Sequence, residues 1–200
     1  MDSGRVNNMV YQLKYIPKKY KALQLDVISI AEKLGDYGLI TTLMNAPLTG
    51  ESLAGKWKSI ETSLQSLSVS GSEIPDISLW DSQGLYLSAK AYDAMAEALK
   101  DDGEFLSITV EGKPAYLFNC RVFGQEDLAL TERKYLDGEP DGVLSLVFDD
   151  ADLIEGNRYV FRSKLQGCTA LYASDKFKQL CEKHSLFGLK FDTSLLDIFD

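Results

Sequence analysis

The side chains best suited to chemistry in this sequence are a group of carboxylates. Asp149, Asp150 and Asp152 lie within four consecutive positions, and oxygen ligands of this kind suit magnesium or calcium. Their spacing lacks the glycine and the distal glutamate of an EF-hand loop. An enzyme that uses a divalent ion bound by these three residues is therefore an alternative hypothesis, which we rank below a protein that is not an enzyme.

The other reactive side chains are one histidine and three cysteines. His184 is the only histidine, and it falls in the last turn of an expected helix, where it meets the negative end of the helix dipole. Cys120, Cys168 and Cys181 form no CxxC pair and make a poor zinc site with one histidine. The sequence has no phosphate-binding glycine loop and no GxSxG motif. We therefore expect no catalytic residues, no metal and no cofactor.

Composition and cysteine usage narrow the class of protein. The chain has 200 residues, of which 45% are hydrophobic, enough to bury a core. No run approaches the ~20 apolar residues of a membrane helix, and the N-terminal sequence lacks the apolar segment of a signal peptide. An odd number of dispersed cysteines fits a reducing compartment. We expect a cytoplasmic protein that does not bind membranes.

The net charge of −9 is concentrated in one part of the sequence. Residues 1–100 carry 10 basic and 11 acidic side chains, whereas residues 101–200 carry 11 and 19. The acidic window, residues 126–155, holds ten carboxylates against two basic groups. Such a field repels phosphate backbones and attracts a basic protein. We expect no nucleic-acid partner; the carboxylates either face a basic protein or keep two turns solvated.

The elements that position these residues are clearest between residues 158 and 191. We expect strands at Tyr159–Phe161 and Ala170–Ala173, a helix that begins after Ser174, and a closing strand after Gly188. Ser174 lies where an extended pattern gives way to a 3.6-residue period, so its hydroxyl is predicted to cap the helix.

Hydrophobic periodicity predicts the remaining elements. Residues 23–34 carry both periods and receive no assignment. The predicted elements are a half-buried strand at 9–15, a short strand at 41–46, an amphipathic helix at 52–67, a strand at 85–87, a helix at 89–99 capped by Ser88, a hairpin at 105–122 and a buried central strand at 143–148.

Two segments repeat one pattern at an offset of 86 residues. Leu85-Tyr86-x-Ser88-x-Lys90 and Leu171-Tyr172-x-Ser174-x-Lys176 each open a strand, cap, helix, glycine and strand. Either duplication or similar capping chemistry accounts for the match. The sequence therefore predicts an α+β fold with mixed sheets, a few helices and two similar strand–helix–strand units, around residues 85–110 and 170–191.

Domain organisation is left open by the polar stretch at residues 68–73, which is either a linker or a surface loop. Residues 1–74 accordingly form either an N-terminal α+β subdomain beside a domain of residues 75–200, or part of a single compact chain. Oligomeric state cannot be read from the sequence.

Several short segments between Pro75 and Phe191 carry a resemblance to a known family. They are Pro75-Asp76-Ile77, Leu87-Ser88-x-Lys90-Ala91, Gly103-Glu104-Phe105-Leu106, Tyr116-Leu117-Phe118-Asn119, Val160-Phe161-Arg162, Tyr172-x-Ser174-Asp175-x-Phe177-Lys178 and Gly188-Leu189-x-Phe191. In order and spacing they resemble the family-11 immunity proteins of bacterial polymorphic toxin systems. The resemblance implies a small cytoplasmic protein, encoded beside a toxin, that binds and blocks that toxin. It brings no catalytic residues.

The charge map and the resemblance lead to one hypothesis, a non-enzymatic immunity protein whose acidic window faces a basic toxin. An adaptor or scaffold protein, in which the carboxylates serve only solubility, is a further alternative. The first candidates for toxin contacts are Asp137, Glu139, Asp141, Asp149, Asp150 and Asp152.

Overall fold

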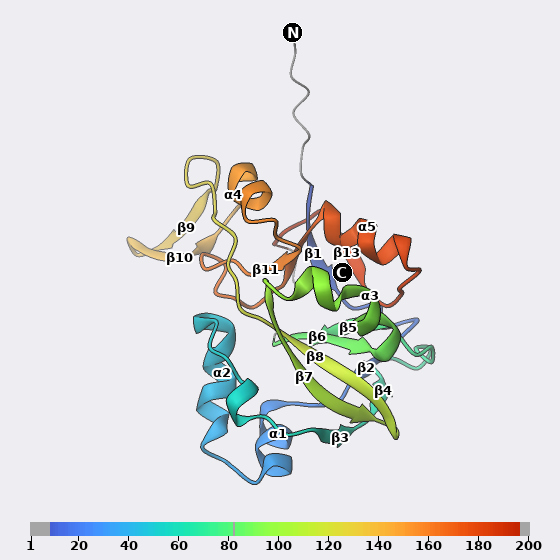
Figure 1. Ribbon diagram of the computed structural model, residues 1–200. Coiled ribbons are helices and arrows are strands. Elements are labelled where there is room, and N and C mark those ends of the chain that lie inside the picture. Colours follow the sequence, from blue (N-terminus) through green and yellow to red (C-terminus); the bar gives the residue numbers. More distant parts are fainter. Residues whose placement is uncertain (1–8, 82, 197–200) are drawn as a thin grey trace.

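Two sheets carry most of the packing in this α+β protein (Figure 1). The computed structural model describes residues 9–81 and 83–196. The five-stranded sheet has the order β3 (Ile60–Thr62), β7 (Gly103–Val110), β8 (Lys113–Cys120), β6 (Gly84–Ser88) and β5 (Ile77–Trp80). The four-stranded sheet has the order β11 (Val160–Phe161), β12 (Tyr172–Ser174), β1 (Val10–Lys14) and β13 (Lys190–Asp192).

The remaining elements are two two-stranded sheets and six helices among the described residues. β2 (Lys21–Leu23) pairs with β4 (Leu64–Ser66), and β9 (Arg133–Leu136) pairs with β10 (Glu139–Val143). The helices are α1 (Val27–Leu34), α2 (Leu39–Thr49), the 3-10 helix η1 (Ala54–Lys56), α3 (Ala89–Leu99), α4 (Asp150–Glu155) and α5 (Asp175–Lys183).

The two predicted strand–helix–strand units are present and share one topology. In the first, β6, α3 and β7 are followed by β8, which lies between β6 and β7 and is antiparallel to both. In the second, β12, α5 and β13 enclose β1, which is antiparallel to both. An additional strand pairs with the outer edge of each unit, β5 on β6 and β11 on β12. The sequence repeat therefore corresponds to a repeat of structure, with one difference in the origin of the central strand.

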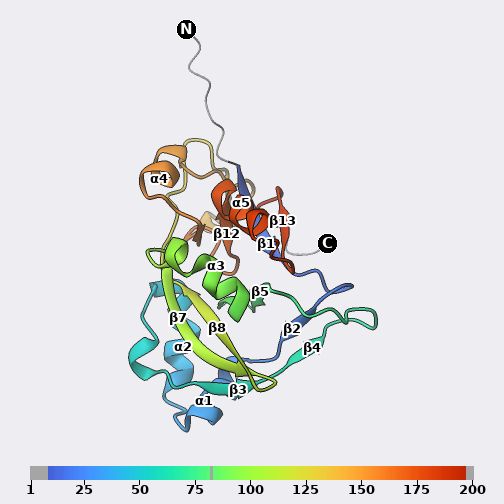
Figure 2. The same ribbon diagram turned by 45° about the vertical axis from the view of Figure 1, so that its right-hand side comes forward.

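Three clusters of buried side chains hold these layers together. The largest lies between the two sheets and includes Met95 of α3 and Phe177 of α5, both with no exposed surface. The second lies on the other side of the five-stranded sheet, where α1 and α2 cover it (Figures 1 and 2). The third joins Phe161 and Tyr172 to Phe148 of the acidic window. Because β11 and β12 contribute to it, the acidic window is anchored on the four-stranded sheet.

Two predictions in the first third of the chain are wrong. Residues 41–46, predicted as a strand, lie in α2, which ends at Gly50 with a positive φ of 69°. Residues 52–67, predicted as one helix, form η1, β3 and β4. Ile60, Thr62 and Leu64 are buried at alternate positions, a period of two that a longer helical pattern conceals. β3 pairs in parallel with β7, and this pairing holds residues 60–62 in a strand rather than a helix.

Residues 143–148, predicted as a buried central strand, do not form one. β10 ends at Val143, and Leu144 is exposed. Leu146 and Phe148 are buried in the third cluster without belonging to a named strand. The apolar run is therefore divided between solvent and core, which its composition does not reveal.

β1 was predicted to be half-buried, and it is buried on both faces. Gln12 and Lys14 are 5% and 9% exposed. Val10, at an alternate position on the same face, packs against the third cluster, whereas Leu13 of the other face belongs to the first. The Lys14 ammonium lies 2.9 Å from an Asp192 carboxylate oxygen on β13. A paired charge of this kind allows a lysine to be buried.

The two serines at the helix starts behave differently. The Ser88 hydroxyl accepts a hydrogen bond from the Ala91 N–H at 3.2 Å and caps α3, as predicted. The Ser174 hydroxyl makes no cap bond and instead donates to the Arg158 carbonyl oxygen at 2.7 Å. The predicted side-chain cap of α5 is therefore wrong, because the bond to Arg158 directs the Ser174 hydroxyl toward the backbone before β11 and no helix N–H donates to it.

Candidate functional site

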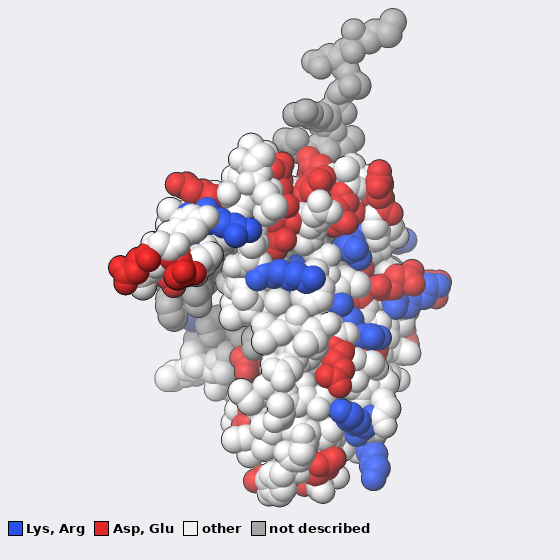
Figure 3. Space-filling model, turned by 90° about the vertical axis from the view of Figure 1, so that its left-hand side faces the viewer, with Lys and Arg blue, Asp and Glu red and all other residues white. Residues whose placement is uncertain are grey.

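The most distinctive surface feature is an arm, residues 128–144, that carries the β9–β10 hairpin away from the sheets (Figure 1). Every residue of β9 is exposed, and so is every residue of β10 except Val143. Figure 3 shows Asp and Glu side chains gathered over the upper part of the face that carries the arm and α4. The arm therefore presents most of its side chains to solvent.

A two-residue turn closes the arm. Asp137 and Gly138 both have positive φ, 51° and 89°, the conformation that suits the twist of a β-hairpin and that Asp-Gly favours. Leu136 pairs with Glu139 and Tyr135 with Pro140, and the register then shifts at a bulge. The Lys134 ammonium lies 2.6 Å from an Asp141 carboxylate oxygen across the hairpin. Local rules therefore fix the arm's geometry without core packing.

Hydrogen bonds tie the base of the arm to the body of the protein. The Asp127 N–H donates to the Val147 carbonyl oxygen at 2.9 Å. The Asp127 carboxylate accepts from the N–H groups of Ala129 and Leu130 at 2.9 and 3.1 Å. Thr131 both donates to and accepts from the backbone of Val147 at 3.1 Å. This base orients the arm relative to the four-stranded sheet.

Large apolar side chains on the arm face solvent. Tyr135 and Leu136 are 58% and 61% exposed, although they occupy neighbouring positions of a strand. Successive side chains of a strand point to opposite faces, so each face of the hairpin presents a large apolar group to solvent, which is typical of an interaction surface when polar groups surround it. The exposed apolar residues of the arm are Leu128, Leu130, Tyr135, Leu136 and Leu144.

The six candidate carboxylates fall into two groups. Asp137, Glu139 and Asp141 are exposed on the hairpin. Asp149, Asp150 and Asp152 lie at the start of α4, where negative side chains meet the positive end of the helix. The structure thus places three of the six on the arm and three beside its base. The apolar members of this surface were not predicted, because leucines and a tyrosine in such a run usually indicate burial.

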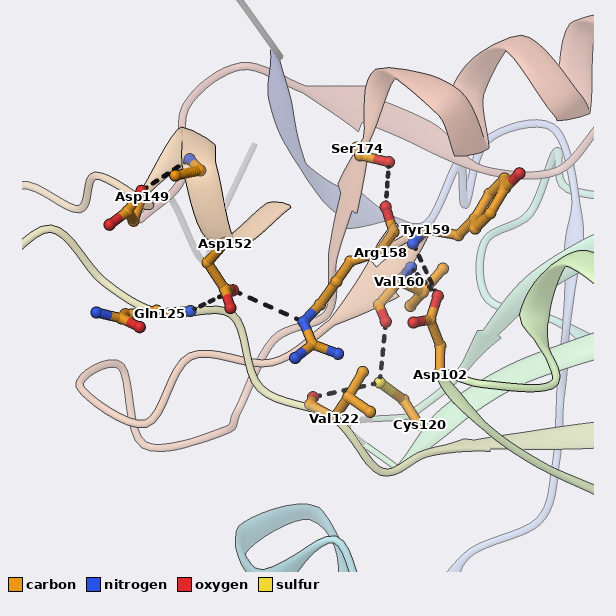
Figure 4. Close-up of polar contacts among 11 residues, drawn as sticks. Asp102, Cys120, Val122, Gln125, Asp149, Asp152, Arg158, Tyr159, Val160 and Ser174 are labelled. Carbon is orange, nitrogen blue, oxygen red and sulfur yellow. Dashed lines mark hydrogen bonds and ion pairs between the residues drawn. The ribbon is translucent and has the colours of Figure 1, made fainter. Parts of the chain in front are cut away.

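Two of the three carboxylates at the start of α4, Asp149 and Asp152, have structural partners (Figure 4). Asp149 caps the helix by accepting from the Ala151 N–H at 2.8 Å. Asp152 accepts from the Gln125 N–H at 3.0 Å and lies 3.7 Å from the Arg158 Nε. Within residues 9–81 and 83–196, no three Asp, Glu, His or Cys side chains are grouped as a metal site would require. The arrangement holds α4 and residue 125 together.

Behind this surface lies a buried carboxylate, Asp102, which links the two units (Figure 4). One of its oxygens accepts from the Tyr159 N–H at 2.7 Å and from the Val160 N–H at 3.0 Å. Burial raises the pKa of Asp102 to about 6, against the lowering effect of these two hydrogen bonds and of the Arg158 charge. Asp102 thus fastens β11 to the end of α3.

The cysteines and the histidine show no arrangement for catalysis. Cys120, Cys168 and Cys181 are buried and unpaired. Burial raises the pKa of Cys120 to about 11 and that of Cys181 to about 12, which disfavours the reactive thiolate. His184 follows α5, and its backbone N–H donates to the Leu180 carbonyl oxygen at 3.2 Å. These residues pack and terminate elements.

A shallow apolar cavity of about 330 Å³ lies beside α5. Its walls include Cys181, Leu186, Phe187 and Phe191, and Phe187 is exposed at its mouth. This hollow was not predicted, because its walls come from a helix, a loop and β13. Its few polar groups do not form a reactive cluster.

Comparison with known proteins adds no family to this description. No protein-family model matches the chain, and no curated protein matches it. No helix within the described part of the chain has the length and apolar character needed to cross a bilayer. The resemblance to immunity proteins therefore stays a prediction, and the arm is the strongest candidate site.

Proposed function

We propose that this chain is a non-enzymatic immunity protein that binds and neutralises a protein toxin with a basic surface. The observation that carries the proposal is the arm, which combines exposed apolar side chains with carboxylates on a hairpin outside the core. In this proposal the protein acts in the cytoplasm, where the toxin would otherwise reach its target.

The two kinds of side chain on the arm have different roles in the proposed complex. Carboxylates attract a cationic partner and raise the rate of association. Apolar side chains supply affinity, since burying a large one contributes roughly 1.5–3 kcal/mol before the costs of association. Tyr135 adds a rigid aromatic ring, a type enriched at the centres of interfaces. The arm thus has both components of a standard protein interface.

Growth rescue tests the proposal directly. The toxin gene in the neighbouring reading frame is co-expressed with the wild-type chain, and rescued growth is expected. A variant with all six candidate carboxylates changed to the matching amides is expected to lose rescue, because the attractive field of the acidic window is lost. Asparagine retains the side-chain acceptors that Asp149 and Asp152 use in α4.

A matched control removes the same charge elsewhere. It changes six exposed carboxylates outside the acidic window to amides, namely Glu32, Asp93, Glu97, Asp101, Glu111 and Glu182. We expect this control to rescue growth as the wild type does. Absence of rescue by the wild type would contradict the function, whereas equal rescue by both six-residue variants would contradict the site.

A further inference from the structure

The two edges of the β9–β10 hairpin are not equivalent. In a hairpin closed by a two-residue turn, the residues flanking the turn exchange hydrogen bonds, and the next pair directs its backbone groups outward. Leu136 and Glu139 flank the turn, and Tyr135 and Pro140 are the next pair. The N–H and C=O groups of Tyr135 therefore point away from β10.

The bulge extends this pattern to a second residue of β9. Beyond the bulge, Val143 pairs with Arg133. The next bond of the ladder runs from the Leu144 N–H to the Glu132 carbonyl oxygen at 2.7 Å. Since hydrogen-bonded and outward-facing pairs alternate, Arg133 also directs its N–H and C=O groups outward. β9 thus offers two residues, each with a donor and an acceptor, along one edge.

The edge of β10 is blocked at the equivalent position. Pro140 occupies the outward-facing site opposite Tyr135, and proline has no N–H group to donate. Proline on an edge strand is a common protection against unwanted pairing. β9 has no proline, and within residues 9–81 and 83–196 no strand other than β10 pairs with it.

We propose that the outer edge of β9 receives an extended cationic segment of the partner protein, which adds to the hairpin as a third strand. This inference rests on the proposed function and specifies how the partner docks. Main-chain hydrogen bonds from Arg133 and Tyr135 provide the pairing, and the side chains of Tyr135 and Leu136 contact the added strand from opposite faces.

Charge decides which occupant fits this edge. The acidic window carries ten carboxylates and two basic groups. Both basic groups, Arg133 and Lys134, lie on β9, and the Lys134 charge is paired with Asp141 of β10. The net field around an added strand with lysines or arginines is therefore attractive. A second copy of this chain would bring an equal negative window to the same edge, and the like charges would repel. The occupant is therefore a basic strand from another protein.

The probe for this inference is a ten-residue peptide of alternating lysine and valine, titrated into the ¹⁵N-labelled full chain at low salt. We expect amide chemical shifts of Arg133 and Tyr135 to change most. A glutamate–valine peptide and a lysine–valine peptide N-methylated at every residue are expected to leave these amides unchanged. The first lacks the attractive charge, and the second lacks the donors that pair strands.

A pair of variants separates backbone pairing from side-chain contact. Tyr135→Ala removes the ring and keeps the N–H group, whereas Tyr135→Pro removes both while leaving the ladder to β10 intact. We expect Tyr135→Pro to bind the peptide about tenfold more weakly than Tyr135→Ala. This is the effect expected when the hydrogen bond from the N–H group of residue 135 to the added strand is lost.

Four results would overturn the inference. They are unchanged amides on β9 at millimolar peptide, equal binding by the N-methylated peptide, equal binding by the two Tyr135 variants, and shifts on β9 that grow with protein concentration alone, which would identify a second copy as the occupant. The growth assay is independent of this titration. Rescue with a negative titration leaves the immunity function standing without strand addition, and absence of rescue removes the function itself.

Discussion

Replacing Asp102 with asparagine is expected to stabilise the protein near neutral pH and to remove part of the dependence of its stability on pH. Asp102 is 2% exposed and accepts hydrogen bonds from two N–H groups at the start of β11. Asparagine keeps a side-chain oxygen for these bonds and carries no charge to bury. The substitution therefore removes the cost of burying the ionised carboxylate.

The magnitude follows from linkage. Burial raises the pKa of Asp102 from 3.8 to about 6 in the folded protein, so the folded state binds the proton more tightly than the unfolded state does. The stabilisation from this proton is fully present below pH 4 and is lost as pH rises through 6. At about 1.4 kcal/mol per pKa unit, the loss amounts to about 3 kcal/mol.

Urea unfolding between pH 4 and pH 7.5 measures the effect, with fluorescence of the buried Trp80 as the signal. We expect the free energy of unfolding of the variant to be higher than that of the wild type by up to about 3 kcal/mol at pH 7.5. At pH 4 the two free energies are expected to be nearly equal. Asp101→Asn, at an exposed neighbouring carboxylate, controls for the loss of one charge. A difference that stays constant over this pH range, or a variant that is less stable at pH 7.5, would refute the reasoning.

Three further predictions concern caps, close packing and the arm. Ser88→Ala is expected to lower the free energy of unfolding by about 1 kcal/mol, and Ser88→Asp is expected to restore it. Ser174→Asp is expected to destabilise the protein, because its carboxylate cannot donate to the Arg158 carbonyl oxygen. Chemical denaturation measures the stability of all three variants. Gly84→Ala is expected to lower the melting temperature far more than Gly55→Ala, since a Cβ at position 84 meets backbone of the adjacent strand and one at position 55 meets nothing within 4 Å. Leu136→Ser is expected to weaken toxin binding in a pull-down assay without lowering the melting temperature, and an equal loss of binding for Leu48→Ser, on the distant α2, would contradict the assignment of the arm.

The elements that the sequence predicted well are those whose signals are local. α3 combines a serine cap with a helical period, and β7 and β8 are joined by a glycine turn, so neighbouring residues suffice to specify them. The error at residues 60–62 arises from a distant partner. Ile60 pairs with Ile108, and a partner so far along the chain leaves no mark on the local period.

The two serines that precede α3 and α5 show how a tertiary contact overrides a shared local pattern. Ser88 and Ser174 stand in the same sequence context, and only Ser174 has the Arg158 carbonyl oxygen within hydrogen-bonding distance. Of the candidate site, the sequence predicted the carboxylates but not the exposed apolar residues. Its charges could be located because charge needs no partner to be recognised, whereas the exposure of Leu136 and Leu144 depends on where the chain leaves the core.

The position of β1 has a consequence for synthesis on the ribosome. The five-stranded sheet has all its strands once residue 120 has been made, but the four-stranded sheet encloses a strand from residues 10–14 between strands that end at residues 174 and 192. β1 therefore leaves the ribosome before both of its neighbours and must wait for β13 before both its edges are covered. Because Gln12 lies opposite Asp192 in antiparallel register, a rearranged gene that encoded β1 directly after β13 would join them as a hairpin, and the two strands would then be close in sequence.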